Sequence, residues 1–209
     1  MVDGGSVMMK ATAKKPIPEF VGKFGLGNLD ILRGYLGIYN SYDNRDAVSI
    51  TVNETERNGE KIKTDISFKA SGQSSANYRL VAESALKKIM VFTATEWDVI
   101  LDNVQKSKIS DFDKFSSVLN AYSKTFGIAT RDGKLYFTLG DDQSAVSKAE
   151  IEIGETTNKL NSSFKYPVKE VMTILRNPSP TIHFTNRGFM MVKIDSGLVD
   201  YEFTFKGGN

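Results

Sequence analysis

The stretch that decides the fold is SDFDKFSSVLNAYSKTFGIATRDGKLYFTLGDDQSAVSKAEIEI, which runs from Ser110 to Ile153. Its first part has the pattern of an amphipathic helix. Ser110 and Asp111 are typical residues for the start of a helix. Apolar residues then recur at helical spacing and predict one buried stripe: Phe112, Phe115, Val118, Leu119 and Tyr122.

The rest of this stretch has the pattern of antiparallel strands. Strands are expected at Phe126–Thr130 and Lys134–Leu139. Between them lies Asp132-Gly133, a strong signal for a tight hairpin. A third strand is expected at Val146–Ile153. The stretch therefore predicts one helix followed by three strands.

An earlier copy of this unit is expected from about Gly27 to Ala82. Its helix would carry Leu29, Leu32, Leu36 and Tyr39 on one stripe, and its strands would be Ala47–Val52, Lys61–Ala70 and Asn77–Val81. A later copy is expected from Phe164 onward. Its helix would carry Val168, Val171, Met172 and Leu175, and its strands would be Thr181–Thr185, Phe189–Asp195 and Leu198–Phe205. A repeat of this kind constrains the whole architecture.

The first residues are interpreted as the end of a further copy. Ser6–Ala13 has the pattern of a strand, and about 30 residues of that copy are expected to be missing before Met1, judged from the repeat length. Ala82–Lys88 separates two copies and is the expected domain boundary. We therefore expect an α+β fold with two similar domains, 1–87 and 88–209. Helices would cover one face of antiparallel sheets, and the first domain would be N-terminally incomplete.

Composition narrows the class of protein. The chain has 209 residues, 40% of them hydrophobic, and a formal net charge of +2. It contains no cysteine, which excludes disulfides and agrees with a reducing cytoplasm. No apolar run reaches the length of a membrane span, and the N-terminus lacks the apolar core of a signal peptide. We expect a cytoplasmic protein without a membrane partner, in the host cytoplasm if it is viral.

Basic residues recur on the helix faces that lie opposite the apolar stripes. On the middle helix, Lys114 and Lys124 share such a face, and Lys106 and Lys108 lie just before it. Lys169 and Arg176 share a face of the last helix, and Arg33 lies on the first. An ordinary solvated face would explain any one helix. The same bias on three helices predicts a diffuse positive surface that binds phosphates without reading bases.

The residues for common catalytic chemistry are sparse. His183 is the only histidine and, with no cysteine present, leaves no zinc site of a common type. It is expected at a surface or hydrogen-bonded strand position. No glycine pattern of a nucleotide-binding loop occurs. We therefore expect no enzyme activity, no metal and no cofactor.

Three stretches resemble the DNA sliding clamps, the processivity factors of replicative polymerases. They are Gly27–Asn40 (GNLDILRGYLGIYN), Thr125–Asp142 (TFGIATRDGKLYFTLGDD) and Phe164–Gly207, which ends in GLVDYEFTFKG. The similarity extends over nearly the whole chain. It is greatest to the trimeric clamps of T-even-type bacteriophages, and the eukaryotic and archaeal PCNA-like clamps are more distant.

The resemblance implies a non-catalytic homotrimeric ring around duplex DNA, placed there by a clamp loader for DNA replication. The helices would line the inside of the ring. It also implies that the DNA polymerase docks a peptide in an apolar pocket near the interdomain linker. By position, that pocket would involve Ser84, Leu86, Ile89, Tyr201 and Phe203. Plain core packing is the alternative reading of these five residues.

Two rival functions remain open. A structural ring component of a phage particle would also be β-rich and oligomeric, but it has no need of basic helix faces. A small-molecule binding module would require a formed apolar pocket in place of a repeat.

Overall fold

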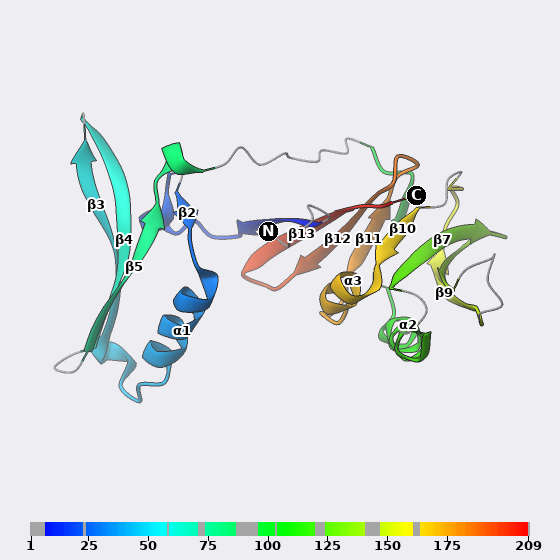
Figure 1. Cartoon of the computed structure of the whole chain (residues 1–209), viewed down its shortest axis with the longest axis horizontal. Helices are drawn as coiled ribbons and strands as arrows, with labels where there is room; N and C mark the ends of the chain where they lie inside the picture. The colour runs from blue at the N-terminus through cyan, green and yellow to red at the C-terminus, as the bar shows by residue number, and fades with distance from the viewer. Residues whose placement is uncertain are drawn as a thin grey trace. The chain divides into compact units, whose positions relative to one another are not determined.

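The computed structural model describes residues 7–22, 24–57, 59–70, 74–86, 96–102, 104–119, 124–140, 147–160 and 164–208. The chain forms two compact units. We call Pro16–Met90 the small unit, and Met1–Lys15 together with Val91–Asn209 the large unit. Figure 1 labels most of their helices and strands.

In the part that the structure describes, the small unit is one α-helix on one four-stranded antiparallel sheet (Figure 1). Its sheet has the order β2-β5-β4-β3. The elements are β2 (Gly25–Leu26), α1 (Leu29–Asn40), β3 (Val48–Arg57), β4 (Glu60–Ala70) and β5 (Ser74–Val81), with short 3-10 helices at Pro18–Phe20, Arg45–Ala47 and Glu83–Ala85.

Helix α1 begins directly after a residue whose side chain caps it. The Asn28 side chain accepts hydrogen bonds from the backbone N–H groups of Asp30 and Ile31, at 3.0 and 3.3 Å. Such a cap satisfies donors that the first turn leaves free. The stripe expected to be buried is only partly so, because Leu29 and Leu36 remain 58% and 45% exposed.

The core of the small unit is built around aromatic rings. Tyr39 of α1 stacks on Phe68 of β4 with ring centroids 5.5 Å apart, and Tyr35 lies 5.7 Å from the same ring. Phe68 is fully buried. The buried side of α1 is therefore the side of Leu32, Tyr35 and Tyr39, a quarter turn away from Leu36.

In its described residues, the large unit contains two helices and two antiparallel sheets. One sheet has the order β10-β7-β8-β9 and the other β1-β13-β12-β11-β6. The helices are α2 (Lys106–Leu119) and α3 (Val168–Leu175). The strands are β1 (Val7–Ala13), β6 (Val99–Leu101), β7 (Thr125–Arg131), β8 (Lys134–Leu139), β9 (Ala149–Glu155), β10 (Lys165–Pro167), β11 (Thr181–Phe184), β12 (Phe189–Asp195) and β13 (Val199–Lys206).

The two halves of the large unit exchange strands. Strand β10 leads directly into α3, yet it pairs with β7, the first strand after α2. Strand β6 precedes α2, yet it pairs with β11, the first strand after α3. Each helix-plus-three-strand unit therefore completes the sheet of the other.

One continuous core joins these halves. Phe112 of α2 packs edge-on against Phe126 and Phe137 at centroid distances of 5.0 and 5.1 Å. Phe137 in turn lies 6.2 Å from Phe184 of the other sheet. All four rings are buried. Aromatic pairs in these orientations add to the stabilisation that burial alone provides.

Helix α2 differs from the sequence prediction in its start and in its buried side. It begins at Lys106, so Lys106 and Lys108 belong to its first turn. The prediction that Phe115 and Val118 are buried is wrong, because they are 49% and 76% exposed. The buried stripe consists of Ile109, Phe112, Ser116 and Leu119. Tyr122 lies outside the described residues.

The later strands follow the prediction closely. Strands β8 and β12 have the predicted bounds. Asp132 and Gly133 have φ values of 50° and 74°. Two successive residues at positive φ are what a tight hairpin turn with matching twist requires. The predicted fold class, α+β with antiparallel sheets, is confirmed.

Strand β1 lies in the large unit. It pairs along its full length with β13, with Val7 opposite Phe205 and Ala13 opposite Val199. Met1–Lys15 belongs to the same compact unit as Val91–Asn209. The domain partition at 1–87 and 88–209 stays a prediction. Part of the predicted boundary segment, 87–88, lies outside the described residues.

Candidate nucleic-acid interface

Helices α2 and α3 lie next to each other on one side of the strands of the large unit (Figure 1). An ion pair connects them. The Arg176 guanidinium donates two hydrogen bonds to the Asp113 carboxylate, at 3.0 and 3.1 Å. Arg176 was predicted to face DNA, and its charge is here balanced by a carboxylate of the neighbouring helix.

Two further bases of the predicted surface also have acidic partners. The Lys108 ammonium lies 3.4 Å from Glu152 of β9, and Lys134 lies 2.9 Å from the same carboxylate. The Lys134 hydrogen bond is the main reason that the pKa of Glu152 lies below its usual range. Lys114 lies 3.2 Å from Asp111 on the same exposed side of α2.

In the large unit, three of the predicted bases have no acidic partner among the described residues. Lys106, Lys124 and Lys169 are exposed and make no ion pair with any residue that the structure describes. The carbonyl oxygen of Lys124 accepts a hydrogen bond from the Val168 N–H at 3.0 Å. The prediction that Lys124 lies on the middle helix is wrong, because Lys124 lies outside α2 and directly before β7. The contact with Val168 places it beside the start of α3, where Lys169 lies.

Because of these contacts, only part of the predicted positive surface of the large unit consists of unpaired bases. Exposed, unpaired lysines can bind phosphate at small desolvation cost, whereas an ion-paired base must first leave its carboxylate. Arg33, the remaining predicted base, is an exposed residue of the small unit. Sequence periodicity finds the bases but does not show which of them an acid from another element neutralises.

The residues predicted to form a peptide pocket come from both units. In the small unit, Ser84 and Leu86 are exposed at the 3-10 helix Glu83–Ala85 and just after it. Ile89 lies outside the described residues. In the large unit, Tyr201 and Phe203 stack with ring centroids 6.1 Å apart. The assembly of these residues into one pocket stays a prediction.

Tyr201 and Phe203 lie on the core side of their sheet. Phe203 is the cross-strand partner of the buried Val192, and Tyr201 that of the buried Ile194. Cross-strand partners point to the same face of a sheet. Both rings are half-buried and pack against the core, so part of their surface is already used inside the large unit.

His183 is buried, contrary to the expectation of a surface or hydrogen-bonded position. It is 7% exposed, and neither ring nitrogen has a hydrogen-bond partner among the described residues. Trp97 packs edge-on against it at 5.3 Å. Burial, aided by Lys193, lowers the pKa of His183 and favours the neutral ring.

Within the described residues, no group of three or more His, Cys, Asp or Glu side chains is arranged to hold a metal ion. In the same part of the chain, no helix is both long and apolar enough to cross a membrane.

Comparison with known proteins identifies the fold. A solved structure of the C-terminal region of FEN-1 bound to A. fulgidus PCNA is similar to this chain, with a TM-score of 0.51 and 13% sequence identity. The match covers 76% of this chain and 64% of that chain. The predicted clamp fold is thereby confirmed. No protein-family model matches the sequence, and no curated protein matches it.

Proposed function

We propose that this protein is a DNA sliding clamp of the bacteriophage type. It encircles duplex DNA and tethers the replicative polymerase to its template, without catalysing a reaction itself. The observation that carries the proposal is the clamp fold together with the neighbouring helices α2 and α3. Lys106 of α2, Lys169 of α3 and Lys124, which lies beside the start of α3, are exposed and make no ion pair with a described residue.

The chemistry of these lysines suits a protein that must slide. Flexible ammonium groups attract phosphates of any sequence, and each contact is weak and readily exchanged with counterions. They carry no hydrogen-bonding pattern aimed at base edges, so they do not favour one position along the duplex. A ring retains the DNA by topology, which leaves its inner surface free to bind weakly.

The proposed partners follow from this role. A clamp loader would place a homotrimer on duplex DNA in the cytoplasm, and the polymerase would dock a peptide near Ser84, Leu86 and Ile89. Half-exposed Tyr201 and Phe203 offer apolar surface to such a peptide. A pocket of this kind would have an apolar floor and few polar groups, which is typical of helix and peptide anchors.

The proposal is tested by a charge-reversal variant, Lys106→Glu with Lys124→Glu and Lys169→Glu. Retention on a closed circular duplex would be measured over a range of salt concentrations, together with polymerase product length in the presence of a loader. We expect both to fall. The difference from the unmodified protein should be largest at low salt, because phosphate contacts are screened as salt rises.

A matched variant with Lys61→Glu, Lys69→Glu and Lys206→Glu controls for net charge. These lysines are exposed on β4 and β13 and do not lie on the helices. Retention should stay close to that of the unmodified protein. Equal losses in both triple variants would mean that overall charge matters and the helix face does not. No loss in either variant would favour a structural ring component.

A further inference from the structure

His183 lies on the face of the five-stranded sheet that points away from the core of the large unit. Its neighbours along β11, Ile182 and Phe184, are fully buried in that core. Successive side chains of a strand point to opposite faces of the sheet, so the imidazole points to the other face. Its cross-strand partners there are Ile100 of β6 and Met191 of β12. The ring therefore lies outside the core, and yet it is only 7% exposed.

Trp97 covers the imidazole from the solvent side. Its indole packs edge-on against the ring of His183, with the ring centroids 5.3 Å apart, and is itself only half-buried. Ile100, the neighbour of His183 on β6, is 49% exposed, so this face of the sheet is open to solvent beside the histidine. The indole is therefore the cover that keeps water from this side of the imidazole.

Hydrogen bonds of Asp98 fix the backbone next to Trp97. The Asp98 N–H donates to the Phe184 carbonyl at 2.9 Å, and the Asp98 carboxylate accepts from the Asn186 N–H at 2.6 Å. The Asp98 carbonyl accepts from the side-chain amide of Asn158 at 2.7 Å. None of these bonds involves the indole. The indole can therefore turn outward by rotation of its own side chain while the backbone stays in place.

The neutral imidazole is the form that this site accepts. Neither ring nitrogen of His183 has a hydrogen-bond partner among the described residues. A neutral imidazole carries one N–H donor, whereas the protonated ring carries two donors and a positive charge. Burial of a charge without hydrogen bonds costs far more than burial of a neutral polar group. A proton on His183 therefore favours an arrangement in which the ring reaches water.

The charged groups around the ring do not reverse this preference. Burial is the main reason that the pKa of His183 lies below its usual value of 6.5, and Lys193 of β12 lowers the pKa further. Asp102, which follows β6, and Glu202 of β13 act in the opposite direction. Glu202 is shared with Lys193 and Lys10, whose ammonium groups lie 3.8 and 3.4 Å from its carboxylate. Because the pKa is still lowered, the two carboxylates only partly offset the burial of the ring.

We propose that His183 and Trp97 form an acid-sensitive latch, in which the neutral imidazole is closed beneath the indole and a proton on the imidazole turns the indole out to solvent. The latch lies shortly after Met90–Val91, where the chain passes from the small unit to the large unit. The closed form binds the proton less readily than the open form. Closure is therefore favoured above about pH 6.5 and loses stability as the pH falls below that value.

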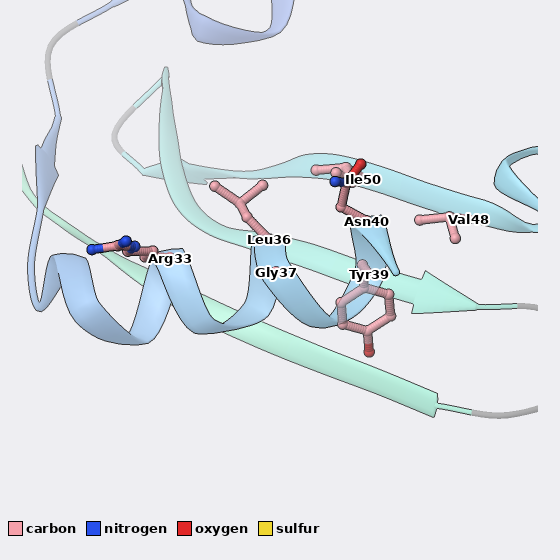
Figure 2. A pocket seen from close by; sticks show the side chains of 7 residues that line it. All are labelled: Arg33, Leu36, Gly37, Tyr39, Asn40, Val48 and Ile50. Carbon is pink, nitrogen blue, oxygen red and sulfur yellow. The ribbon is translucent and has the colours of Figure 1, made fainter. Parts of the chain in front are cut away.

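The shallow cavity of the small unit, between α1 and β3, offers no second group of this kind. His183 is the only histidine of the chain. The described residues that line the cavity include no histidine and no carboxylate (Figure 2). A proton taken up in mild acid is therefore assigned to His183 and not to this cavity.

The first experiment uses the fact that His183 and Trp97 are the only histidine and the only tryptophan of the chain. Proton NMR of the imidazole and fluorescence of the indole would be followed in the unmodified protein from about pH 8 to about pH 5, the range in which histidine titrates. We expect the two transitions to share one midpoint below about pH 6.5. The indole emission should move to longer wavelength in acid, because the ring becomes hydrated.

Far-UV circular dichroism over the same pH range separates the latch from general acid unfolding. We expect the signal to stay unchanged while the indole emission shifts, because the sheets remain intact. Loss of secondary structure in the same step would overturn the proposal. An imidazole midpoint at about 6.5, the value of a ring in water, would also overturn it.

The second experiment removes each partner of the latch in turn. His183→Phe keeps an aromatic ring that cannot bind a proton, so the Trp97 emission should no longer depend on pH in this range. His183→Met, which matches its cross-strand neighbour Met191, gives the same test if the phenylalanine variant does not fold. An acid shift of the emission that persists in a folded variant without His183 would contradict the proposal.

Trp97→Ala tests the cover itself. The imidazole midpoint should rise toward about 6.5, because water then reaches the ring. Phe115→Ala is the matched control, since Phe115 is an exposed aromatic residue of α2, and it should leave the midpoint unchanged. Equal midpoints in Trp97→Ala and the unmodified protein would mean that the indole is not the cover. None of these readouts involves DNA, so the result is independent of the proposed clamp function.

Discussion

The guanidinium of Arg176, at the end of α3, donates two hydrogen bonds to the carboxylate of Asp113 in the middle of α2. This is a contact between the two helix-plus-strand halves of the large unit. It also explains why a base expected to face DNA is electrically balanced. The geometry is bidentate, which is the favourable arrangement for an arginine and a carboxylate.

The contribution of this pair should be small but measurable. The side chains are 63% and 37% exposed, so solvent screens their attraction. A double-mutant cycle with Arg176→Ala and Asp113→Ala should give a coupling free energy of about 0.5–1 kcal/mol, measured by urea unfolding. The coupling should shrink in high salt. A coupling that is zero at low salt would mean that the two side chains do not meet in solution.

The buried side of α2 can be tested with two phenylalanines. Phe112 is fully buried, whereas Phe115 is 49% exposed. Phe112→Ala should lower the free energy of unfolding by about 3–5 kcal/mol, because it leaves a cavity between Phe126 and Phe137. Phe115→Ala should cost about 0.5 kcal/mol or less, as for most surface substitutions. The reverse order would mean that the helix is rotated about its axis.

Two glycines should respond in opposite directions to substitution by alanine. Gly133 has a φ of 74° in the β7–β8 hairpin, so Gly133→Ala should destabilise the protein by about 1 kcal/mol through backbone strain. Gly34 lies in α1, and an added Cβ meets nothing within 4 Å. Gly34→Ala should therefore stabilise by about 0.5–1 kcal/mol. Thermal unfolding at low protein concentration distinguishes the two.

The carboxylate of Asp65 should make stability depend on pH. A hydrogen bond from Asn53, at 2.6 Å, is the main reason that the pKa of Asp65 lies below its usual range, and Thr64 and Ser67 also contribute. A folded-state pKa below the unfolded value means that the contribution is present above about pH 4 and is lost as the pH falls through the folded pKa.

Urea unfolding at neutral and at strongly acidic pH would check this expectation. Asp65→Asn should be less stable than the unmodified protein at neutral pH, and the difference should vanish in acid. Asn53→Ala, which removes the main cause of the shift, should reduce the same pH dependence. If Asp65→Asn differs from the unmodified protein equally at both pH values, the ionised carboxylate is not the source.

Local patterns in the sequence predicted the elements well where the turn chemistry is strong. The bounds of β8 follow from Asp132-Gly133, which can take the positive φ values of the turn. The buried side of α2 was harder to predict, because Phe115 and Val118 have the spacing and polarity of core residues. Ser116 is buried instead, since its hydroxyl donates to the Asp113 carbonyl at 2.9 Å and is therefore satisfied.

Contacts between distant parts of the chain could not be predicted from periodicity. Nothing in the pattern of β6 shows that it pairs with β11 and not with β7. Likewise, the spacing of Lys108 and Arg176 places them on helix faces, but their acidic partners Glu152 and Asp113 come from other elements. The sequence thus predicted the candidate surface as a set of basic residues. Only the fold shows which of these residues form ion pairs and which do not.

The pairing of β1 with β13 has a consequence for how the protein is made. These strands come from the beginning and the end of the sequence, so a ribosome produces β1 long before its partner exists. At the usual rate of translation, β1 must wait roughly 10 to 40 s for β13 to emerge. During that time it is a strand without a sheet, and such edges promote aggregation. The five-stranded sheet can therefore form only after β13 has been made, and Lys10, exposed in β1, is the kind of charge that discourages edge-to-edge association until then.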